Sequence, residues 1–427
     1  MQKNSSPAKP GGLLAALTSA RSGPLLLCLG MLVAYCLLPL IIDAASSGTV
    51  RFGILATMTT VSVLAVLAGA LTPVLDPWTS GRLPRLAVGS GTFNAAVWTP
   101  FLLFACVAWA TAPEIPLIAA LSGADPNEIA ILREQFLKAR EGWQASFVYI
   151  NAIFSGALLP YSLALMFLHG MRVRWLAAGF FFLFCISFLE KVFFFKIALP
   201  MLYLILQGKA HTRLSPRMMV LGMCAILAAV TVFSGSGQLG AIQGDGFFSV
   251  TYVPEGGLAH LLWRSVAIPM VTAADAIRVL AEHFNDQPLL GATSSFLAGM
   301  FGMERIEYER MVFAAQWGQN ETGTGSANSV FFTEAFVNFG WLGVILFSYV
   351  VGLLMRMFAV SRDEAFKALW LLFAFGVYTS GLIGMLLSNG FILLFIMALF
   401  VRIRVRTSRG RSFVPAMRPS SSTQNQN

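Results

Sequence analysis

Charged residues are scarce in this chain of 427 residues: only 11% are Asp, Glu, Lys or Arg, whereas 57% are hydrophobic. A typical soluble domain is about 25% charged. So few charges cannot cover the surface of a protein of this size in water. The mean hydropathy is +0.73, so we expect lipid to be the solvent, which excludes a soluble globular enzyme.

Motifs of several soluble enzyme classes are also missing. The chain has no GxxxxGK[ST] loop, no GxGxxG loop after a predicted strand, no HExxH and no CxxC sequence. It has no internal repeat, which disfavours an inverted-repeat transporter. All five cysteines lie in apolar runs, which predicts neither a disulfide framework nor a thiolate metal site. We therefore expect no cofactor and no metal, and no nucleic acid partner despite the net charge of +9.

Long apolar runs dominate what is present. A helix needs about 20 apolar residues to cross a bilayer. Glu190, Lys191 and Lys196 interrupt the longest run, which predicts two helices that meet near these charges. We predict an all-α polytopic membrane protein with about ten transmembrane helices in the runs 24–42, 52–75, 93–110, 146–168, 175–206 (two helices), 218–233, 338–358, 370–387 and 391–401.

Basic residues fall in alternate connections between these runs, and the intervening connections are neutral or acidic. Residues 234–330, for example, hold nine acidic residues and four arginines. Because cytoplasmic loops carry the excess of Lys and Arg, both termini are predicted to be cytoplasmic in a bacterial inner membrane. The predicted parts are a cytoplasmic N-terminus 1–23, helices 1–7 in 24–233 with an outer helical loop 111–144, a large periplasmic loop 234–337, helices 8–10 in 338–401, and a basic, disordered tail 402–427.

The first outer loop contains a predicted helix over 125–143, with Asp125 as its N-cap. Arg133 and Arg140 are seven residues apart, so they would share one face of that helix. Two readings are open. The helix is either a solvated outer helix or a two-arginine clamp for an anionic lipid headgroup.

The large loop contains a second helical pattern over 258–284, which Pro269 is expected to kink or divide. Arg278 has Asp275 and Glu282 at helical spacing, which indicates structural pairing. Arg264 has no acidic residue three or four positions away, and an unpaired guanidinium suits bidentate phosphate binding. The Glu-Tyr-Glu sequence at 307–309 is interpreted as part of a helix face rather than a metal site.

The segment NSVFFTEAFVNFGWLG at 328–343 resembles the pattern that enters a late helix of the bacterial O-antigen polymerase (Wzy-type) family. The upstream order Arg264, His283, Pro288, Gly291 and the large late outer loop are similar too. The resemblance implies an all-helical glycosyltransferase of the GT-C class. Such an enzyme joins undecaprenyl-diphosphate-linked oligosaccharide repeat units into a surface polysaccharide (O-antigen, capsule or exopolysaccharide) on the periplasmic face. A chain-length regulator and a flippase would be its partners.

The resemblance also implies roles for particular residues. Glu334 would lie near the acceptor hydroxyl, and either Glu334 or His283 would act as the base. The cations expected to bind the diphosphate are Arg264, Arg133, Arg140, Lys191 and Lys196, and the acceptor-binding amides are Asn328 and Asn338.

Three other functions stay open. The related O-antigen ligases carry a histidine before the asparagine at the position of Ala327-Asn328, so alanine favours a polymerase over a ligase. A lipid-linked-oligosaccharide flippase or transporter is the non-enzymatic alternative. A non-catalytic assembly or chain-length partner is the third.

Overall fold

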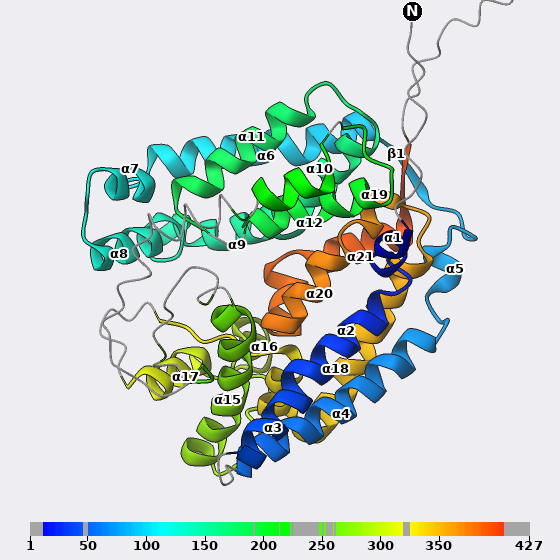
Figure 1. The fold of residues 1–427 in the computed structure, drawn as a ribbon. Helices are drawn as coiled ribbons and strands as arrows, with labels where there is room; N and C mark the ends of the chain where they lie inside the picture. Colours follow the sequence, from blue (N-terminus) through cyan, green and yellow to red (C-terminus); the bar gives the residue numbers. More distant parts are fainter. Residues whose placement is uncertain are drawn as a thin grey trace, which may run out of the picture.

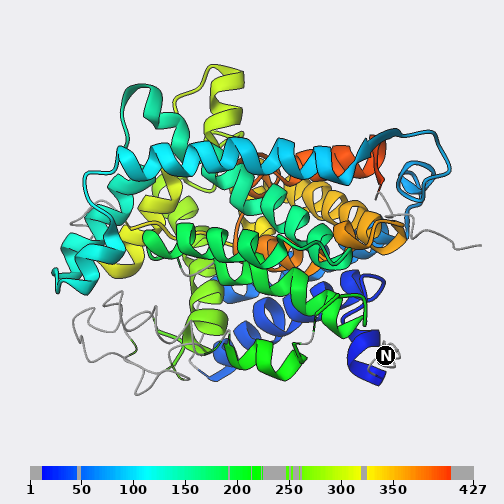
Figure 2. The same ribbon diagram turned by 90° about the horizontal axis from the view of Figure 1, so that it is seen from above.

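The computed structural model describes residues 12–45, 50–190, 193–212, 214–222, 224, 247–249, 252, 259, 262–318 and 325–404. These residues are mostly helical, and the helices lie in two groups that cross each other (Figure 1). One group contains α2, α4 and α18. The other contains α6, α9, α10, α11 and α12, and the view from above shows the same helices running lengthwise beside one another (Figure 2).

The first half of the chain forms these elements: α1 (Gly12–Leu17), α2 (Gly23–Leu32), η1 (Val33–Leu37), α3 (Leu38–Ala45), α4 (Val50–Leu71), α5 (Asp76–Thr79), β1 (Leu86–Gly89), α6 (Ser90–Ala110), α7 (Pro116–Leu121), α8 (Pro126–Leu137), η2 (Gly142–Ser146), α9 (Phe147–Ile153), η3 (Phe154–Leu158), α10 (Leu159–Leu168), α11 (Arg174–Ser187) and α12 (Phe193–Leu206).

The second half forms η4 (Trp263–Ala267), α15 (Ile268–Phe284), α16 (Ser295–Phe301), α17 (Tyr308–Trp317), α18 (Phe331–Val360), α19 (Glu364–Lys367), α20 (Trp370–Thr379), η5 (Gly384–Ser388), α21 (Phe391–Phe400) and β2 (Val401–Arg404).

Every predicted apolar run contains described helical residues, although of the run 218–233 only 218–222 and 224 are described. Within the described ranges, five helices are long and apolar enough to cross a membrane: Gly23–Ala44, Phe52–Leu71, Ser90–Ala110, Gly142–Leu168 and Phe331–Val360. The apolar helices Arg174–Ser187, Phe195–Leu206 and Phe391–Phe400 are shorter. The structure therefore supports an all-α membrane protein, and the number of ten spans stays a prediction.

Three prolines explain irregular turns inside the long helices. The π-helical turns η1, η3 and η4 each end two residues before Pro39, Pro160 and Pro269, respectively. Proline cannot donate a backbone hydrogen bond, and its ring collides with the carbonyl one turn earlier. A π turn relieves this collision by adding one residue to the turn. The expected disturbance at Pro269 is thus a wide turn that leads directly into α15.

The neighbouring helices α4 and α18 approach each other so closely that only glycine fits at the contact. A Cβ atom on Gly352 would lie 2.1 Å from the carbonyl oxygen of Val66, and one on Gly69 would lie 2.1 Å from that of Tyr349. Near this contact Ser62 and Ser348 share a hydrogen bond of 2.7 Å. Small residues and hydrogen bonds hold helices together in lipid, where hydrophobic association is weak.

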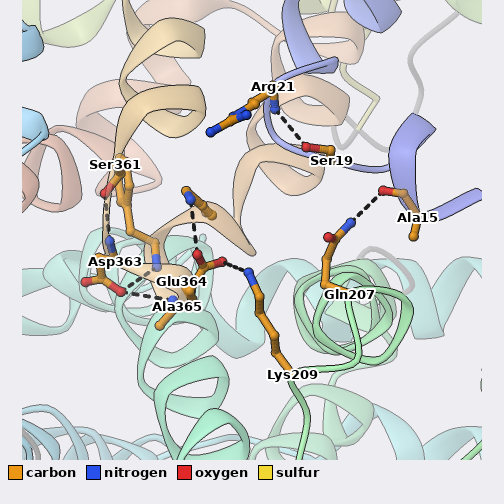
Figure 3. Close-up of polar contacts among 11 residues, drawn as sticks. Ala15, Ser19, Arg21, Gln207, Lys209, Ser361, Asp363, Glu364 and Ala365 are labelled. Atoms are coloured by element: carbon orange, nitrogen blue, oxygen red, sulfur yellow. Dashed lines mark hydrogen bonds and ion pairs between the residues drawn. The ribbon is translucent and has the colours of Figure 1, made fainter. Parts of the chain in front are cut away.

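The connections with basic residues gather at one end of the molecule. Arg356 forms two 2.7 Å bonds with the Asp76 carboxylate, which joins α18 to α5. Lys209 pairs with Glu364 at 2.7 Å, and Gln207 donates to the carbonyl of Ala15 (Figure 3). The sequence predicts that these connections share one side, and the structure brings them together.

Two short strands occur that the sequence does not predict: β1 lies in a predicted connection between two helices, and β2 lies at the predicted end of a helix and start of a disordered tail. β1 pairs in parallel with β2, so that Leu86 lies opposite Val401 and Gly89 lies opposite Arg404. The predicted disordered tail 402–427 therefore begins with three residues of a strand, and residues 405–427 lie outside the described residues. The prediction missed this pairing because it joins residues more than three hundred positions apart.

The end that carries the basic connections is predicted to face the cytoplasm. A reporter fused at Gly208 should therefore show a cytoplasmic location, and one fused at Gly318, on the large acidic loop, should show a periplasmic location. Alkaline phosphatase and fluorescent-protein fusions distinguish the two sides. A cytoplasmic signal at Gly318 would contradict the predicted orientation.

Candidate functional site

The segment 328–343 contains the start of α18, and this helix is interrupted after its first nine residues. α18 is interrupted at Gly340, whose φ of 62° and ψ of −153° are not helical. The predicted span begins at residue 338, but the helix begins at Phe331. Glu334 and Asn338 are one turn apart on the short half before the break, so both project from the same face.

The loop 288–293 is hydrogen-bonded to this broken helix at Asn338. The Asn338 side chain donates to Thr293 Oγ1 at 2.8 Å and to the carbonyl of Glu334 at 2.9 Å, and it accepts from the Gly291 amide at 3.1 Å. The Leu290 amide donates to the Asn338 carbonyl at 2.7 Å. Because these bonds engage both ends of the amide, Asn338 holds the loop to the helix.

A pocket of about 380 Å³, counting the space at its open mouth, lies beside the break. Its lining brings together three predicted site residues, and α17 contributes a second carboxylate. No basic side chain occurs among the lining residues, which are Ala276, Thr293, Tyr308, Glu309, Val312, Ala327, Asn328, Ser329, Glu334, Val337, Asn338 and Gly381.

The Glu334 carboxylate is positioned by the chain that follows α20. It accepts a long hydrogen bond of 3.4 Å from the Ile383 amide. It also lies directly over Gly381, where an added Cβ would be 2.3 Å from Oε1 of Glu334. This glycine makes room for the carboxylate at the wall of the pocket.

Glu309 is the functional candidate that the sequence interpretation missed. Burial raises the pKa of Glu309, its own backbone amide and Arg305 lower it, and Glu307 raises it. Glu307 instead lies at the surface and pairs with Arg310 at 3.0 Å. Two residues separated by two positions at a helix start point about 200° apart. The Glu-Tyr-Glu spacing could therefore have indicated that the two carboxylates face different surroundings.

The other predicted base and the main predicted phosphate ligand do not line this pocket. His283 is exposed in the last turn of α15. Arg264 is exposed on η4, with its guanidinium 5.5 Å from the centre of the Trp263 ring. Trp263 contacts Trp317 at the end of α17, with 6.4 Å between ring centres. Arg264 thus lies beside the helix that carries Glu309.

The structural pairing predicted for Arg278 is confirmed. It bonds to Asp275 at 3.1 Å and lies 3.8 Å from Glu282, and it also donates to the Ala315 carbonyl on α17. Its charge is therefore compensated on its own helix.

No protein-family model matches this chain, and no curated protein or solved structure matches it.

A second polar cluster lies where α11 ends and α12 begins. Buried Lys196 pairs with Glu190 at 2.9 Å and donates to Ser155 at 3.2 Å. Burial lowers the pKa of Arg133, and the charge of Glu190 raises it, so Arg133 lies near this pair. The Arg133 Nε is shielded from solvent and donates to no described residue. Lys191 lies outside the described residues.

Arg140 does not share a helix face with Arg133, so this prediction is wrong. α8 begins after its Asp125 cap as predicted, but it ends at Leu137 rather than at 143. Arg140 donates to the carbonyl oxygens of Phe136 and Thr111 and to Oε1 of Gln144. These bonds tie the connection 111–144 to the end of α6, because the guanidinium compensates carbonyls that the helix ends leave unpaired.

Proposed function

We propose that this protein is a membrane glycosyltransferase that polymerises lipid-diphosphate-linked oligosaccharide repeat units. The observation that carries the proposal is the pocket in which Asn328, Glu334 and Asn338 meet Glu309. The first three belong to the segment that resembles O-antigen polymerases. The proposed substrate carries undecaprenyl diphosphate, and the product is a longer chain on the same type of lipid.

The proposed reaction needs one base and one leaving group. An acceptor sugar hydroxyl attacks the anomeric carbon of the donor chain, and the bond from that carbon to the diphosphate oxygen breaks. Glu334 takes the hydroxyl proton, which a positioned carboxylate does with a contribution of about 10²–10⁴ to the rate. The diphosphate leaves with the bonding electron pair, so no oxidant or reductant is required.

The leaving diphosphate requires cations beside the pocket. The Arg264 guanidinium lies over the Trp263 ring, and Trp263 contacts Trp317 at the end of α17, so Arg264 lies beside that end of the helix. At the other end of α17, Arg310 lies 3.8 Å from Glu134, the residue that follows Arg133. We assign Arg264 and Arg133 to the diphosphate, since a planar guanidinium grips two phosphate oxygens. Lys196 and Lys191 would assist, whereas Arg140 serves the outer loop.

Purified protein in liposomes tests the proposal. The substrate is the lipid-linked repeat unit extracted from a strain that lacks this gene. We expect lipid-linked chains of two or more repeats, resolved on a gel, with no added nucleotide sugar.

Other outcomes would replace the proposal. Transfer of single repeats to lipid A core, without chain growth, would identify a ligase. Movement of the repeat unit between leaflets without a new glycosidic bond would identify a flippase. Unchanged substrate in all three assays would support a non-catalytic partner.

A further inference from the structure

The end of the molecule opposite α8 and α17 holds a group of arginines that the proposed reaction does not use. Figure 1 places β1 and α19 at this end and α8 and α17 at the other. Burial lowers the pKa of Arg85, Asp363 raises it, and Arg362 and Arg402 lower it. Arg85 therefore lies close enough to Arg362 and to Arg402 for their charges to repel it, and these three residues are here named the arginine cluster.

The three members come from distant parts of the chain. Arg85 directly precedes β1, Arg402 lies on β2, and the pairing of the two strands sets Arg402 opposite Ala87. Arg362 follows the end of α18. The fold thus assembles like charges that the sequence separates, and such an arrangement is unfavourable unless an anion compensates it.

Asp363 is the acidic group beside the arginine cluster, but its oxygen atoms are already engaged. Oδ2 accepts from the Tyr161 hydroxyl at 2.6 Å. Oδ1 accepts from the amides of Ala365 and Phe366 at 2.9 and 3.1 Å, which caps α19 (Figure 3). One carboxylate with these three donors balances at most one of the three positive charges.

The Arg85 guanidinium has donors without partners. Its Nε and Nη2 atoms are shielded from solvent and donate no hydrogen bond to the described part of the chain. Guanidinium donors hidden from water carry a cost unless an acceptor is supplied. Arg362 and Arg402 are exposed, so the arginine cluster is open to solvent on their side.

The position of the arginine cluster selects the kind of anion. β1 leads directly into α6, and α18 ends at Val360, so Arg85 and Arg362 lie just beyond the ends of two candidate membrane spans. Exposed apolar side chains occur beside it: Leu86 is 69% and Phe400 is 54% exposed. Phosphate groups of phospholipids lie at this depth, directly above the acyl chains.

We propose that the arginine cluster is a binding site for the phosphate group of an anionic phospholipid headgroup. Arg85, Arg362 and Arg402 bind the phosphate oxygens, and Leu86 and Phe400 contact the acyl chains. The site is separate from the Glu309–Glu334 pocket and does not depend on the glycosyltransferase proposal.

Lipid-dependent thermal stabilisation of the full chain in a neutral detergent tests this site. Added phosphatidylglycerol should raise the melting temperature in a saturable way, and phosphatidylcholine with the same acyl chains should not. Arg85→Gln should weaken the apparent phosphatidylglycerol affinity by about tenfold or more, as expected for loss of a charge-assisted hydrogen bond. Arg402→Gln, on an exposed strand position, provides a second variant if Arg85→Gln does not fold.

Arg82→Gln is the matched control. Arg82 is exposed and lies three residues before Arg85, and its substitution removes the same charge. It should change the affinity by less than about twofold. Stabilisation of the wild type by inorganic phosphate alone, lost in Arg85→Gln, would assign the site to free phosphate. No preference for phosphatidylglycerol or phosphate, or equal loss in Arg82→Gln and Arg85→Gln, would overturn the proposal.

Discussion

Replacing Glu334 by glutamine should reduce the rate of glycan polymerisation by about 10²–10⁴-fold, the contribution of a positioned general base. Glutamine has nearly the same shape, and its side-chain oxygen can still accept from the Ile383 amide that Glu334 contacts at 3.4 Å. It cannot take the proton of the acceptor hydroxyl. The initial rate of chain growth in liposomes measures the loss, and the melting temperature shows whether the variant is folded.

Glu307→Gln is the matched control for this experiment. It makes the same chemical change directly before α17, but the Glu307 side chain is 49% exposed and pairs with Arg310 rather than lining the pocket. Loss of an exposed ion pair costs about 1 kcal/mol or less, so polymerisation should stay within a few-fold of the wild type. Equal rates for Glu334→Gln and wild type, or equal losses in the two variants, would remove Glu334 from the proposed mechanism.

Gly352→Ala should strongly destabilise the protein, although alanine usually favours a helix by about 1 kcal/mol over glycine. The added Cβ would lie 2.1 Å from the Val66 carbonyl oxygen and 2.8 Å from the Ala70 amide nitrogen. Both are backbone atoms, so α4 and α18 must separate to accept it. Overpacking commonly costs about 1–3 kcal/mol, and we expect the upper part of that range because two helix backbones have to move.

Gly30→Ala is the control for this variant, since a Cβ on Gly30 has no atom within 4 Å. It should leave the melting temperature unchanged or raise it. Thermal unfolding in detergent and the yield of folded protein compare the two. Equal stability of Gly352→Ala and Gly30→Ala would mean that α4 and α18 do not approach as closely as the structure indicates.

The candidate site was partly predictable. Glu334 and Asn338 are four residues apart in the segment 328–343, and helical spacing alone puts them on one face. Glu309 could not be placed beside them in the same way, because α17 reaches the pocket through contacts with α15 rather than through its own sequence. The hydrogen bond from the Tyr308 hydroxyl to the Ala276 carbonyl is one such contact.

Sequence spacing predicted the surroundings of some arginines correctly and of others wrongly. It identified Arg278, whose partners lie on the same helix, and the structure confirms them. Helical spacing, which put Arg133 and Arg140 on one face, failed because α8 ends at Leu137, and the Arg140 guanidinium bonds to the carbonyl of Thr111, twenty-nine residues earlier. Interactions across more than one helical turn have no periodic signal in a single sequence.

The sequence by itself determined the membrane character, the helical segments and the grouping of basic connections. The membrane character follows from composition, and the helical segments follow from the length of the apolar runs, which the bilayer thickness sets. The grouping of basic connections follows from the positions of Lys and Arg along the chain. Tertiary structure alone decided the break at Gly340, the position of Glu309 and the assembly of Arg85, Arg362 and Arg402. Each of these depends on which distant segments pack together, and packing is set by shape and charge in three dimensions.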